Sequence, residues 1–422
     1  GGRKVTNYII KGGNKLEGTV KISGSKNASL PIIAATILNK GKTTLYNVPN
    51  IHDTQKMFEI LKQIGAKVIK KSNKVIIDTK NINKNEIPED LMRKMRSSVI
   101  FAGSILGTYK KCTFSYPGGC DIGTRPIDLH LKAFEKLGIN ITKNYGKIIC
   151  NCDKIVGEKI DFEFPSVGAT ENAMLASVLA EGATTITNAA REPEIIDLQN
   201  FLNKMGAKIK GAGTNIIEIE GVKNLKREVS YNIMPDRIEA GTFLCMAGIS
   251  SGNITLENVM PNHIVPIIDK MQEAGAKIEI DKNTIKIQGP KKLKAVDIKT
   301  MPYPGFPTDM QSVFTAMLTV AKGSSIVVEN IFESRYKYVS ELNRMGAKIT
   351  VEGRTALIKG TKKLYGANVK APDLRGGAAL VTAALTAKGI TTVENIEYIL
   401  RGYENFEEKL QKIGVDIYKE GI

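Results

Sequence analysis

The chain has 422 residues, 42% hydrophobic and 24% charged, so disorder is excluded and two or three domains are expected. Lys and Arg number 60 against 43 Asp and Glu, which gives a net charge of +17. No apolar run reaches the ~18 residues of a membrane span, so no transmembrane segment is expected. Five scattered cysteines fit a reducing cytoplasm better than a disulfide framework, and the three histidines lack zinc-ligand spacing.

The positive charge leaves three classes of partner, namely nucleic acid, an anionic membrane surface or a small anionic substrate. Lysines are spread along the whole chain, which is typical of a solvated surface. Arginine is rarer, with 12 residues, and it is the better bidentate partner of phosphate and carboxylate. The positions of the arginines are therefore more informative than the total charge.

A unit of about 70 residues repeats six times along the sequence. In each unit an apolar pattern typical of a last helical turn precedes a glycine, and a β-branched strand pattern follows it. The six glycines are Gly65, Gly138, Gly206, Gly275, Gly346 and Gly414. A second, Thr-rich strand pattern lies between successive glycines, so each unit is expected to read strand, helix, strand, helix, strand, strand.

The ends of the chain predict how the six units divide. The sixth unit stops before its last strand, and the segment 7–12 has the sequence of that missing strand. We therefore expect an N-terminal domain of three units over 23–230. The C-terminal domain of three units is expected to combine 1–22 with 231–422. Because the chain crosses twice between these domains, a hinged cleft is expected.

Residues that break the repeat are the functional candidates, and they lie where strands lead into helices. Such junctions offer backbone N–H groups and the positive end of a helix to an anion. Seven of the 12 arginines lie there, and they are Arg96, Arg125, Arg191, Arg237, Arg335, Arg375 and Arg401. This pattern favours a substrate with phosphate and carboxylate groups. A nucleic-acid groove is less favoured, because no aromatic platform accompanies the arginines and Trp is absent.

Cys120 is the most distinctive single residue. Gly118, Gly119 and Gly123 surround it, and Arg125 follows closely. A glycine-rich loop can expose a thiol, and a basic neighbour can tune its pKa. Cys120 is therefore a candidate reactive group, whereas cysteines in apolar segments are expected to belong to the core.

Long motifs at these junctions identify a family. They include Ser25-Lys26-Asn27, Pro117-Gly118-Gly119-Cys120, Asn188–Glu194, Pro235–Glu239, Phe306–Gln311 and Arg401-Gly402-Tyr403-Glu404. Together they resemble the UDP-N-acetylglucosamine 1-carboxyvinyltransferases of the enolpyruvyl transferase family, from about residue 8 to the end of the chain. The resemblance implies an α/β fold, a two-domain inside-out α/β barrel built from six βαβαββ repeats, with the active site in the interdomain cleft.

The resemblance also implies a reaction. The enolpyruvyl group of phosphoenolpyruvate is transferred to the 3′-hydroxyl of UDP-N-acetylglucosamine by addition and elimination, and phosphate is released. This is the first committed step of peptidoglycan synthesis, and it needs a base, an acid and cations. The implied partners are these two small molecules, with no cofactor, metal, nucleic acid or membrane. A cytoplasmic monomer or weak oligomer is expected.

Site residues follow from the same resemblance. Asp309 is implied as the base and Cys120 as the general acid, which can form a phosphoenolpyruvate adduct and react with fosfomycin. The catalytic set also includes Lys26 and Arg401. Phosphoenolpyruvate is expected to contact Lys26, Asn27, Arg125, Arg335, Arg375 and Arg401. The resemblance implies that Lys26, Arg125 and Arg401 hold its phosphate, and that Arg335 and Arg375 take its carboxylate and the developing charge. The UDP-sugar site is expected to contain Asn27, Arg96, Arg125, Pro126, Ile127, Asp128, Leu129, Phe164, Pro165, Ser166, Val167, Asp309 and Ile331.

One departure and three alternatives remain. The family often has Lys where Phe164 stands, and an apolar ring offers no charged contact to a diphosphate. The sister enzyme that makes 5-enolpyruvylshikimate 3-phosphate shares the donor, although the Cys120 loop and Asn188–Glu194 favour the sugar nucleotide. A basic nucleic-acid-binding repeat protein is the alternative from another class. A catalytically silent paralogue is the third, and the presence of Lys26, Cys120, Asp309 and Arg401 disfavours it.

Overall fold

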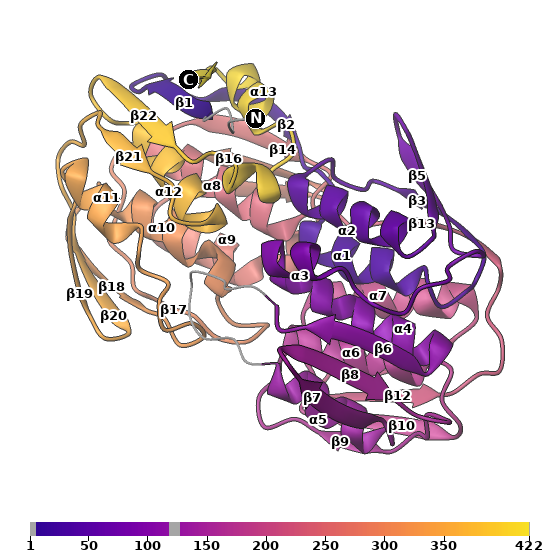
Figure 1. Cartoon of the computed structure of the whole chain (residues 1–422). Coiled ribbons are helices and arrows are strands. Elements are labelled where there is room, and N and C mark those ends of the chain that lie inside the picture. Colours follow the sequence, from indigo (N-terminus) through magenta and orange to yellow (C-terminus); the bar gives the residue numbers. More distant parts are fainter. Residues whose placement is uncertain (1–5, 118–126, 422) are drawn as a thin grey trace. The chain divides into compact units, whose positions relative to one another are not determined.

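The computed structural model describes residues 6–117 and 127–421 (Figure 1). The described chain divides into two compact units. The terminal unit consists of 6–23 and 235–421, and the central unit consists of 24–117 and 127–234. Each unit has its own hydrophobic core. In the described ranges, no helix has both the length and the apolar character needed to cross a membrane.

Three helices lie in the core of each unit. In the central unit they are α1 (Lys26–Ala35), α4 (Phe101–Tyr109) and α6 (Val167–Ser177), and in the terminal unit α8 (Arg237–Ser250), α10 (Gln311–Leu318) and α12 (Leu374–Ala384). Helix α8 is buried at every position from Arg237 to Ile249, so it has no solvent-facing side. A helix buried all round must be enclosed by other elements, which explains why sheets form the outer layer.

The other helices are amphipathic and connect the strands of each repeat. They are α2 (His52–Gln63), α5 (Asp128–Lys136), α7 (Pro193–Met205), α9 (Val265–Glu273), α11 (Val339–Arg344) and α13 (Phe406–Lys412), to which the short α3 (Glu89–Lys94) is added. The six repeat glycines follow the ends of these amphipathic helices other than α3, with φ between 80° and 112°. This confirms the predicted left-handed helix ends, which glycine adopts without a Cβ clash.

The described residues form six sheets, three in each unit. Those of the central unit are β13 (Glu228–Asn232)–β3 (Lys42–Tyr46)–β5 (Lys74–Asp78)–β4 (Lys67–Lys71), β6 (Lys111–Ser115)–β8 (Lys147–Asn151)–β7 (Asn140–Asn144), and β11 (Lys208–Lys210)–β12 (Ile216–Glu220)–β10 (Ala183–Thr187)–β9 (Lys159–Asp161). Those of the terminal unit are β15 (Lys277–Asp281)–β16 (Thr284–Gln288)–β14 (Asn253–Glu257)–β2 (Glu17–Lys21), β17 (Ile298–Lys299)–β18 (Ser324–Val328)–β20 (Thr355–Lys359)–β19 (Lys348–Glu352), and β21 (Asn368–Lys370)–β22 (Ile390–Glu394)–β1 (Thr6–Lys11)–β23 (Asp416–Gly421).

Three strands join sheets far along the chain from their own position. Strand β1 lies between β22 and β23, with Tyr8 opposite both Val393 and Lys419. Strand β2 pairs in parallel with β14, and β13 pairs in parallel with β3. The strands that precede α1 and α8 are thus exchanged between the first and fourth repeats.

The second repeat differs from the predicted pattern because it lacks a first strand. A single bridge between Glu86 and Thr113 stands there, and the sheet β6–β8–β7 has three strands. Pro88, which has no N–H to donate to a ladder, follows at once. The acidic residues Glu89 and Asp90 then begin α3, where negative charge favours a helix start.

A buried ionic cluster fixes the end of the first terminal-unit segment. Lys409 Nζ donates to Ser23 Oγ and to Glu239 Oε1, both at 2.6 Å. Ser23 donates from its backbone N to Glu239 Oε2 at 2.7 Å and from its hydroxyl to Glu404 Oε2 at 2.6 Å. Burial raises the pKa of Glu239, and Lys409 opposes that shift. The cluster therefore depends on the Lys409 charge.

A second buried carboxyl lies near the end of the central unit. Asp197 accepts hydrogen bonds from the Tyr231 hydroxyl at 2.6 Å and from the Met234 backbone N at 3.3 Å. Burial, with a contribution from Glu194, raises the pKa of Asp197 to about 6 against these hydrogen bonds. The folded protein thus binds this proton more tightly than the unfolded chain.

We predict that Lys409→Met lowers the free energy of unfolding by about 3–5 kcal/mol at neutral pH, because Glu239 loses its cation while it stays buried. The loss should shrink at acid pH, where protonation removes the charge. Urea unfolding at several pH values measures it. The double variant Lys409→Met/Glu239→Gln is the control and should recover much of the stability; no recovery would contradict the charge-based explanation.

We predict that Asp197→Asn changes how stability depends on pH. The raised pKa favours folding fully below about pH 4, and this contribution is lost as pH rises to about 6. Relative to the native protein, the variant should gain up to about 3 kcal/mol over this window, because a two-unit shift corresponds to that energy. Urea unfolding from pH 4 to pH 7 measures the gain, and a pH-independent difference would rule out this linkage.

Candidate active site

Asp309 binds two arginines in the terminal unit. It lies in the 3-10 turn η3 (Thr308–Met310), which leads directly into α10. Its Oδ1 accepts from Arg335 Nη2 at 2.8 Å, and its Oδ2 accepts from Arg375 Nη2 at 3.1 Å. The two arginine side chains are 3% exposed and that of Asp309 is 27% exposed. The structure thus joins the predicted base to the two residues predicted to bind a carboxylate.

The first turn of α12 holds Arg375 in place. The Asp373 carboxylate caps this helix and accepts from the backbone N of Arg375 and of Gly376, each at 2.9 Å. The Arg375 guanidinium lies 5.5 Å from the centre of the Tyr403 ring. Burial alone would lower the pKa of Arg375, but Asp309 and Tyr403 outweigh it and the net shift is upward. Arg375 therefore stays charged.

Arg335 follows a loop that also carries Ile331. The Arg335 guanidinium lies 5.3 Å from the centre of the Phe332 ring, a cation–π distance. The backbone N of Ile331 donates to Glu329 Oε1 at 2.8 Å. Loop 329–335 therefore places a predicted UDP-sugar residue and a predicted carboxylate ligand within seven residues of each other.

Arg401 ends the 3-10 turn η4 (Ile399–Arg401) and is half-buried. This turn packs against α12, the helix that begins beside Arg375. Two residues further on, the Tyr403 hydroxyl lies 2.8 Å from Thr242 Oγ1 of α8. The Arg401 motif is thus packed against two core helices of the terminal unit.

Lys26 is the first residue of α1 in the central unit. Ser25 caps this helix by accepting from the backbone N of Ala28 at 3.2 Å. Lys26 Nζ lies 3.5 Å from Asp53 Oδ2, and the Asp53 side chain is fully buried in the first turn of α2. Asp53 therefore orients the ammonium group that was predicted to bind phosphate.

Other predicted sugar-nucleotide residues also lie at helix starts of the central unit. Half-buried Asn27 is in the first turn of α1, and half-buried Arg96 begins the 3-10 helix η1 (Arg96–Ile100). Helix η1 packs against both α1 and α6. The helix ends that carry Asn27 and Val167 thus belong to elements that both contact η1, which begins with Arg96.

The start of α6 exposes a different surface. Phe164 is 44% exposed, and Pro165 is half-buried. Ser166 caps α6 by accepting from the backbone N of Ala169 at 3.3 Å, and Val167 is its first helical residue. Phe164 thus presents an apolar ring to solvent at the position where the family often has Lys.

The start of α5 combines buried and exposed residues. Ile127 is buried, Leu129 is half-buried and Asp128 is exposed. Behind them, His130 Nδ1 lies 2.8 Å from Asn172 Nδ2 of α6, which fixes α5 against that core helix. Cys120, Arg125 and Pro126 lie outside the described residues, so their predicted roles have no geometric test.

Sequence reasoning missed three residues that hold the predicted ones in place. Asp53 pairs with Lys26, Tyr403 lies against Arg375, and Glu329 binds the backbone of Ile331. Tyr403 belongs to one of the family motifs but had no predicted role. Asp53 and Glu329 had weaker signals, each being an acidic residue next to an apolar stretch.

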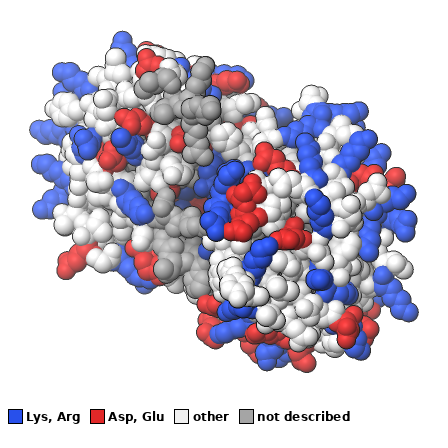
Figure 2. All heavy atoms as spheres, viewed as in Figure 1, with Lys and Arg blue, Asp and Glu red and all other residues white. Residues whose placement is uncertain are grey.

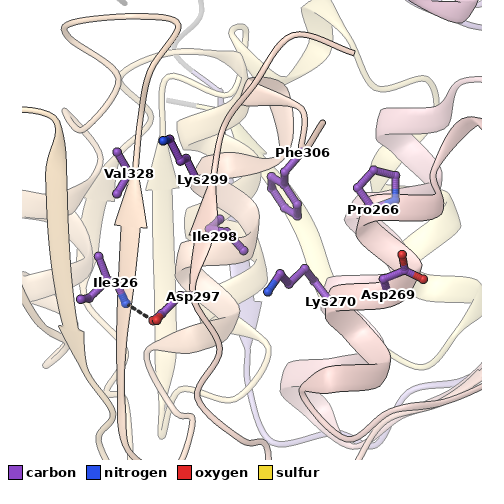
Figure 3. A pocket seen from close by; sticks show the side chains of 9 residues that line it. All are labelled: Pro266, Asp269, Lys270, Asp297, Ile298, Lys299, Phe306, Ile326 and Val328. Atoms are coloured by element: carbon purple, nitrogen blue, oxygen red, sulfur yellow. Dashed lines mark hydrogen bonds between the residues drawn. The ribbon is translucent and has the colours of Figure 1, made fainter. Parts of the chain in front are cut away.

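Two cavities in the described residues lie away from the Asp309 cluster. One of about 490 Å³ separates α9 from the edge strand β17, with Lys270, Phe306 and Lys299 on its walls (Figure 3). Another of about 350 Å³ separates α5 from β9. These are equivalent helix–strand seams of two repeats, so we interpret both as gaps in repeat packing. Of the predicted site residues that the structure describes, Leu129 alone lines either cavity.

The surface charge is dispersed. On the face shown in Figure 2, Lys and Arg side chains are spread over both units among Asp and Glu side chains. Exposed pairs such as Lys208–Glu220 and Lys154–Glu181 contribute little to stability. Among the residues with described positions, no group of three or more His, Cys, Asp or Glu is placed to hold a metal ion.

Solved structures share this fold. The enolpyruvyl transferase NikO from Streptomyces tendae has a TM-score of 0.89 and 23% identity, covering 99% of this chain and 100% of its own. An EPSP synthase from Acinetobacter baumannii has a TM-score of 0.76 and 19% identity, covering 98% and 100%. These likenesses confirm the predicted fold class.

Sequence matches extend over almost the whole chain. UDP-N-acetylglucosamine 1-carboxyvinyltransferase 2 of Caldanaerobacter subterraneus subsp. tengcongensis is 52% identical, covering 98% of this chain and 99% of the relative. UDP-N-acetylglucosamine 1-carboxyvinyltransferase 1 of the same organism is 50% identical, covering 98% of this chain and 100% of the relative. The family model for EPSP synthase (3-phosphoshikimate 1-carboxyvinyltransferase) matches residues 10–410. The resemblance drawn from the motifs is confirmed, and the chain belongs to the enolpyruvyl transferase family that this model describes.

Proposed function

We propose that this chain transfers the enolpyruvyl group of phosphoenolpyruvate to the 3′-hydroxyl of UDP-N-acetylglucosamine and releases phosphate, the first committed step of peptidoglycan synthesis. The observation that carries the proposal is the Arg335–Asp309–Arg375 cluster, in which a partly exposed carboxylate lies between two buried guanidinium groups. It combines a proton acceptor with two ligands for a carboxylate. The names and full-length identity of the relatives support the sugar-nucleotide acceptor.

The reaction assigns a proton to each proposed acid–base group. Asp309 takes the proton of the 3′-hydroxyl while that oxygen bonds to C2 of phosphoenolpyruvate, and Cys120 protonates C3. The tetrahedral phospho-ketal then loses phosphate from C2 and a proton from C3, which restores the double bond. Lys26, Arg125 and Arg401 are proposed to stabilise the phosphate throughout.

The two arginines also link donor binding to base strength. A substrate carboxylate competes with Asp309 for Arg335 and Arg375, because guanidinium groups bind carboxylates bidentately. Each guanidinium that turns to the substrate removes a positive charge from Asp309 and makes it a stronger proton acceptor. The base is then strongest when the donor is bound.

The finer features of the proposal concern partners and location. We place the protein in the cytoplasm, where phosphoenolpyruvate and nucleotide sugars are made. The proposed partners are these two substrates, without nucleic acid or membrane, and the proposed state is a monomer or weak oligomer. The deciding experiment measures phosphate release from phosphoenolpyruvate with UDP-N-acetylglucosamine, with shikimate 3-phosphate and with neither. Phosphate release with shikimate 3-phosphate but not with UDP-N-acetylglucosamine would replace the proposal by the sister reaction. The family model's description also permits that reaction.

We predict that Asp309→Asn lowers kcat by about 10²–10⁴-fold, because a general base contributes a factor of this size. Phosphate release under saturating substrates measures it, and thermal unfolding reports whether the variant is folded. Asp297→Asn, at an exposed carboxylate of the same unit, is the matched control and should retain turnover. Near-native turnover of Asp309→Asn would refute the base assignment.

We predict that Cys120→Ser abolishes covalent labelling by fosfomycin, a phosphoenolpyruvate mimic, because the hydroxyl is a far weaker nucleophile than the thiol. Intact-protein mass spectrometry after incubation with fosfomycin and UDP-N-acetylglucosamine detects the adduct. Cys152→Ser removes another partly accessible thiol and should leave labelling unchanged. Persistent labelling of Cys120→Ser would assign the adduct to a different residue.

A further inference from the structure

Glu329 is a buried carboxylate in the terminal unit that the proposed mechanism does not use. It follows β18 and has no exposed surface. Within the described chain its side chain forms no ion pair, so hydrogen bonds alone compensate its burial. The donors are the hydroxyls of Thr300 at 2.9 Å and Thr308 at 3.0 Å, and the backbone N of Ile331 at 2.8 Å and Phe332 at 3.1 Å.

These hydrogen bonds join both halves of the Asp309–Arg335 ion pair. Thr308 immediately precedes Asp309, and its hydroxyl lies 3.0 Å from each Glu329 carboxylate oxygen. Phe332 precedes Arg335 by three residues, and its ring lies under the Arg335 guanidinium. A shift of the Glu329 carboxylate would therefore move the two ion-pair partners relative to each other.

Comparison of the repeats shows that this position is specialised. A second glycine precedes the Thr-rich strand in four repeats, at Gly41, Gly182, Gly252 and Gly389. Six residues after it stands an asparagine with φ between 52° and 60°, at Asn47, Asn188, Asn258 and Asn395. In three of them the side-chain amide donates to the backbone O after a repeat's first strand, at Ile233, Phe162 and Ile22. The asparagine therefore closes the strand–helix junction in the ordinary repeat.

The fifth repeat, which carries Asp309, departs from this rule. Glu329 occupies the asparagine position without the left-handed backbone, and the asparagine is displaced by one residue. Asn330 then makes the ordinary bond, from its amide to the backbone O of Thr300 at 3.1 Å. The bond that closes the junction is thus made without Glu329, whose carboxylate instead binds two threonine hydroxyls and the backbone of the following loop.

We propose that Glu329 is a positioning residue that sets the geometry of Asp309 through Thr308. This inference rests on the proposed function, since it gives Asp309 the role of base. Glu329 contacts no substrate in this proposal; it holds η3 and the 331–335 loop at a fixed separation. Its contribution belongs to the chemical step, because misplacement of a base by about 1 Å can cost 10²-fold in rate.

The experiment compares two isosteric substitutions that remove one hydrogen bond each from the same carboxylate. Thr308→Val removes the bond next to Asp309, and Thr300→Val removes the bond on the opposite side. We expect Thr308→Val and Glu329→Gln to lower kcat by about 10–100-fold, with the KM of each substrate changed less than about 3-fold. Thr300→Val should keep kcat within about 3-fold and lower the urea midpoint at least as much as Thr308→Val does, because the Thr300 hydroxyl also accepts from the backbone N of Asn330 at 2.9 Å.

Rescue and epistasis complete the design. Thr308→Ser keeps the hydroxyl and should restore kcat to within about 3-fold of the native value. Glu329→Gln should cause no further loss in an Asp309→Asn background, because it acts through Asp309. Equal loss of kcat in Thr300→Val and Thr308→Val, or native turnover of a folded Glu329→Gln, would overturn the proposal. Either result leaves the base assignment standing, since that is decided by Asp309→Asn alone.

Discussion

The burial of the six core helices along nearly their whole length is the constraint on which the rest of this structure depends. A helix such as α8, enclosed on every side, cannot present a polar face to substrate anywhere along its length. Its first turn is the exception, because the initial N–H groups need partners from outside the helix. Polar residues therefore gather where strands lead into core helices, as Ser25, Ser166 and Asp373 show by capping α1, α6 and α12.

The same burial explains why the site residues come in mutually dependent sets. Arg335 and Arg375 are almost fully enclosed, and the cost of desolvating two guanidinium groups demands a counter-charge. Asp309 supplies it and accepts one hydrogen bond from each guanidinium. Under the proposed function, a substrate carboxylate takes the place of Asp309 on these two arginines, and Asp309 is then free to act as the base.

The sequence predicted the repeat well because its markers report backbone conformation. Glycine at the six helix ends follows from the left-handed geometry there, and that geometry does not depend on distant parts of the chain. The missing first strand of the second repeat was not predicted, because one proline and two acids decide it locally. Site membership was carried by motifs, whereas the contacts Lys26–Asp53 and Arg375–Tyr403 join residues distant in sequence. No periodic pattern in the sequence predicts such pairs, so only the folded structure shows them.

A repeat also supplies its own internal reference, which separates structural from functional polar groups. The side-chain amides of Asn47, Asn188 and Asn258 make the same hydrogen bond to a backbone O in three repeats, so the fold explains their presence. Glu329 has no counterpart in those repeats, and Asn330 makes the repeat's usual bond beside it. A buried carboxylate costs free energy unless several donors stabilise it, and an unnecessary one would be replaced readily by an apolar residue. Its presence in the repeat that carries Asp309 supports the proposed positioning role of Glu329.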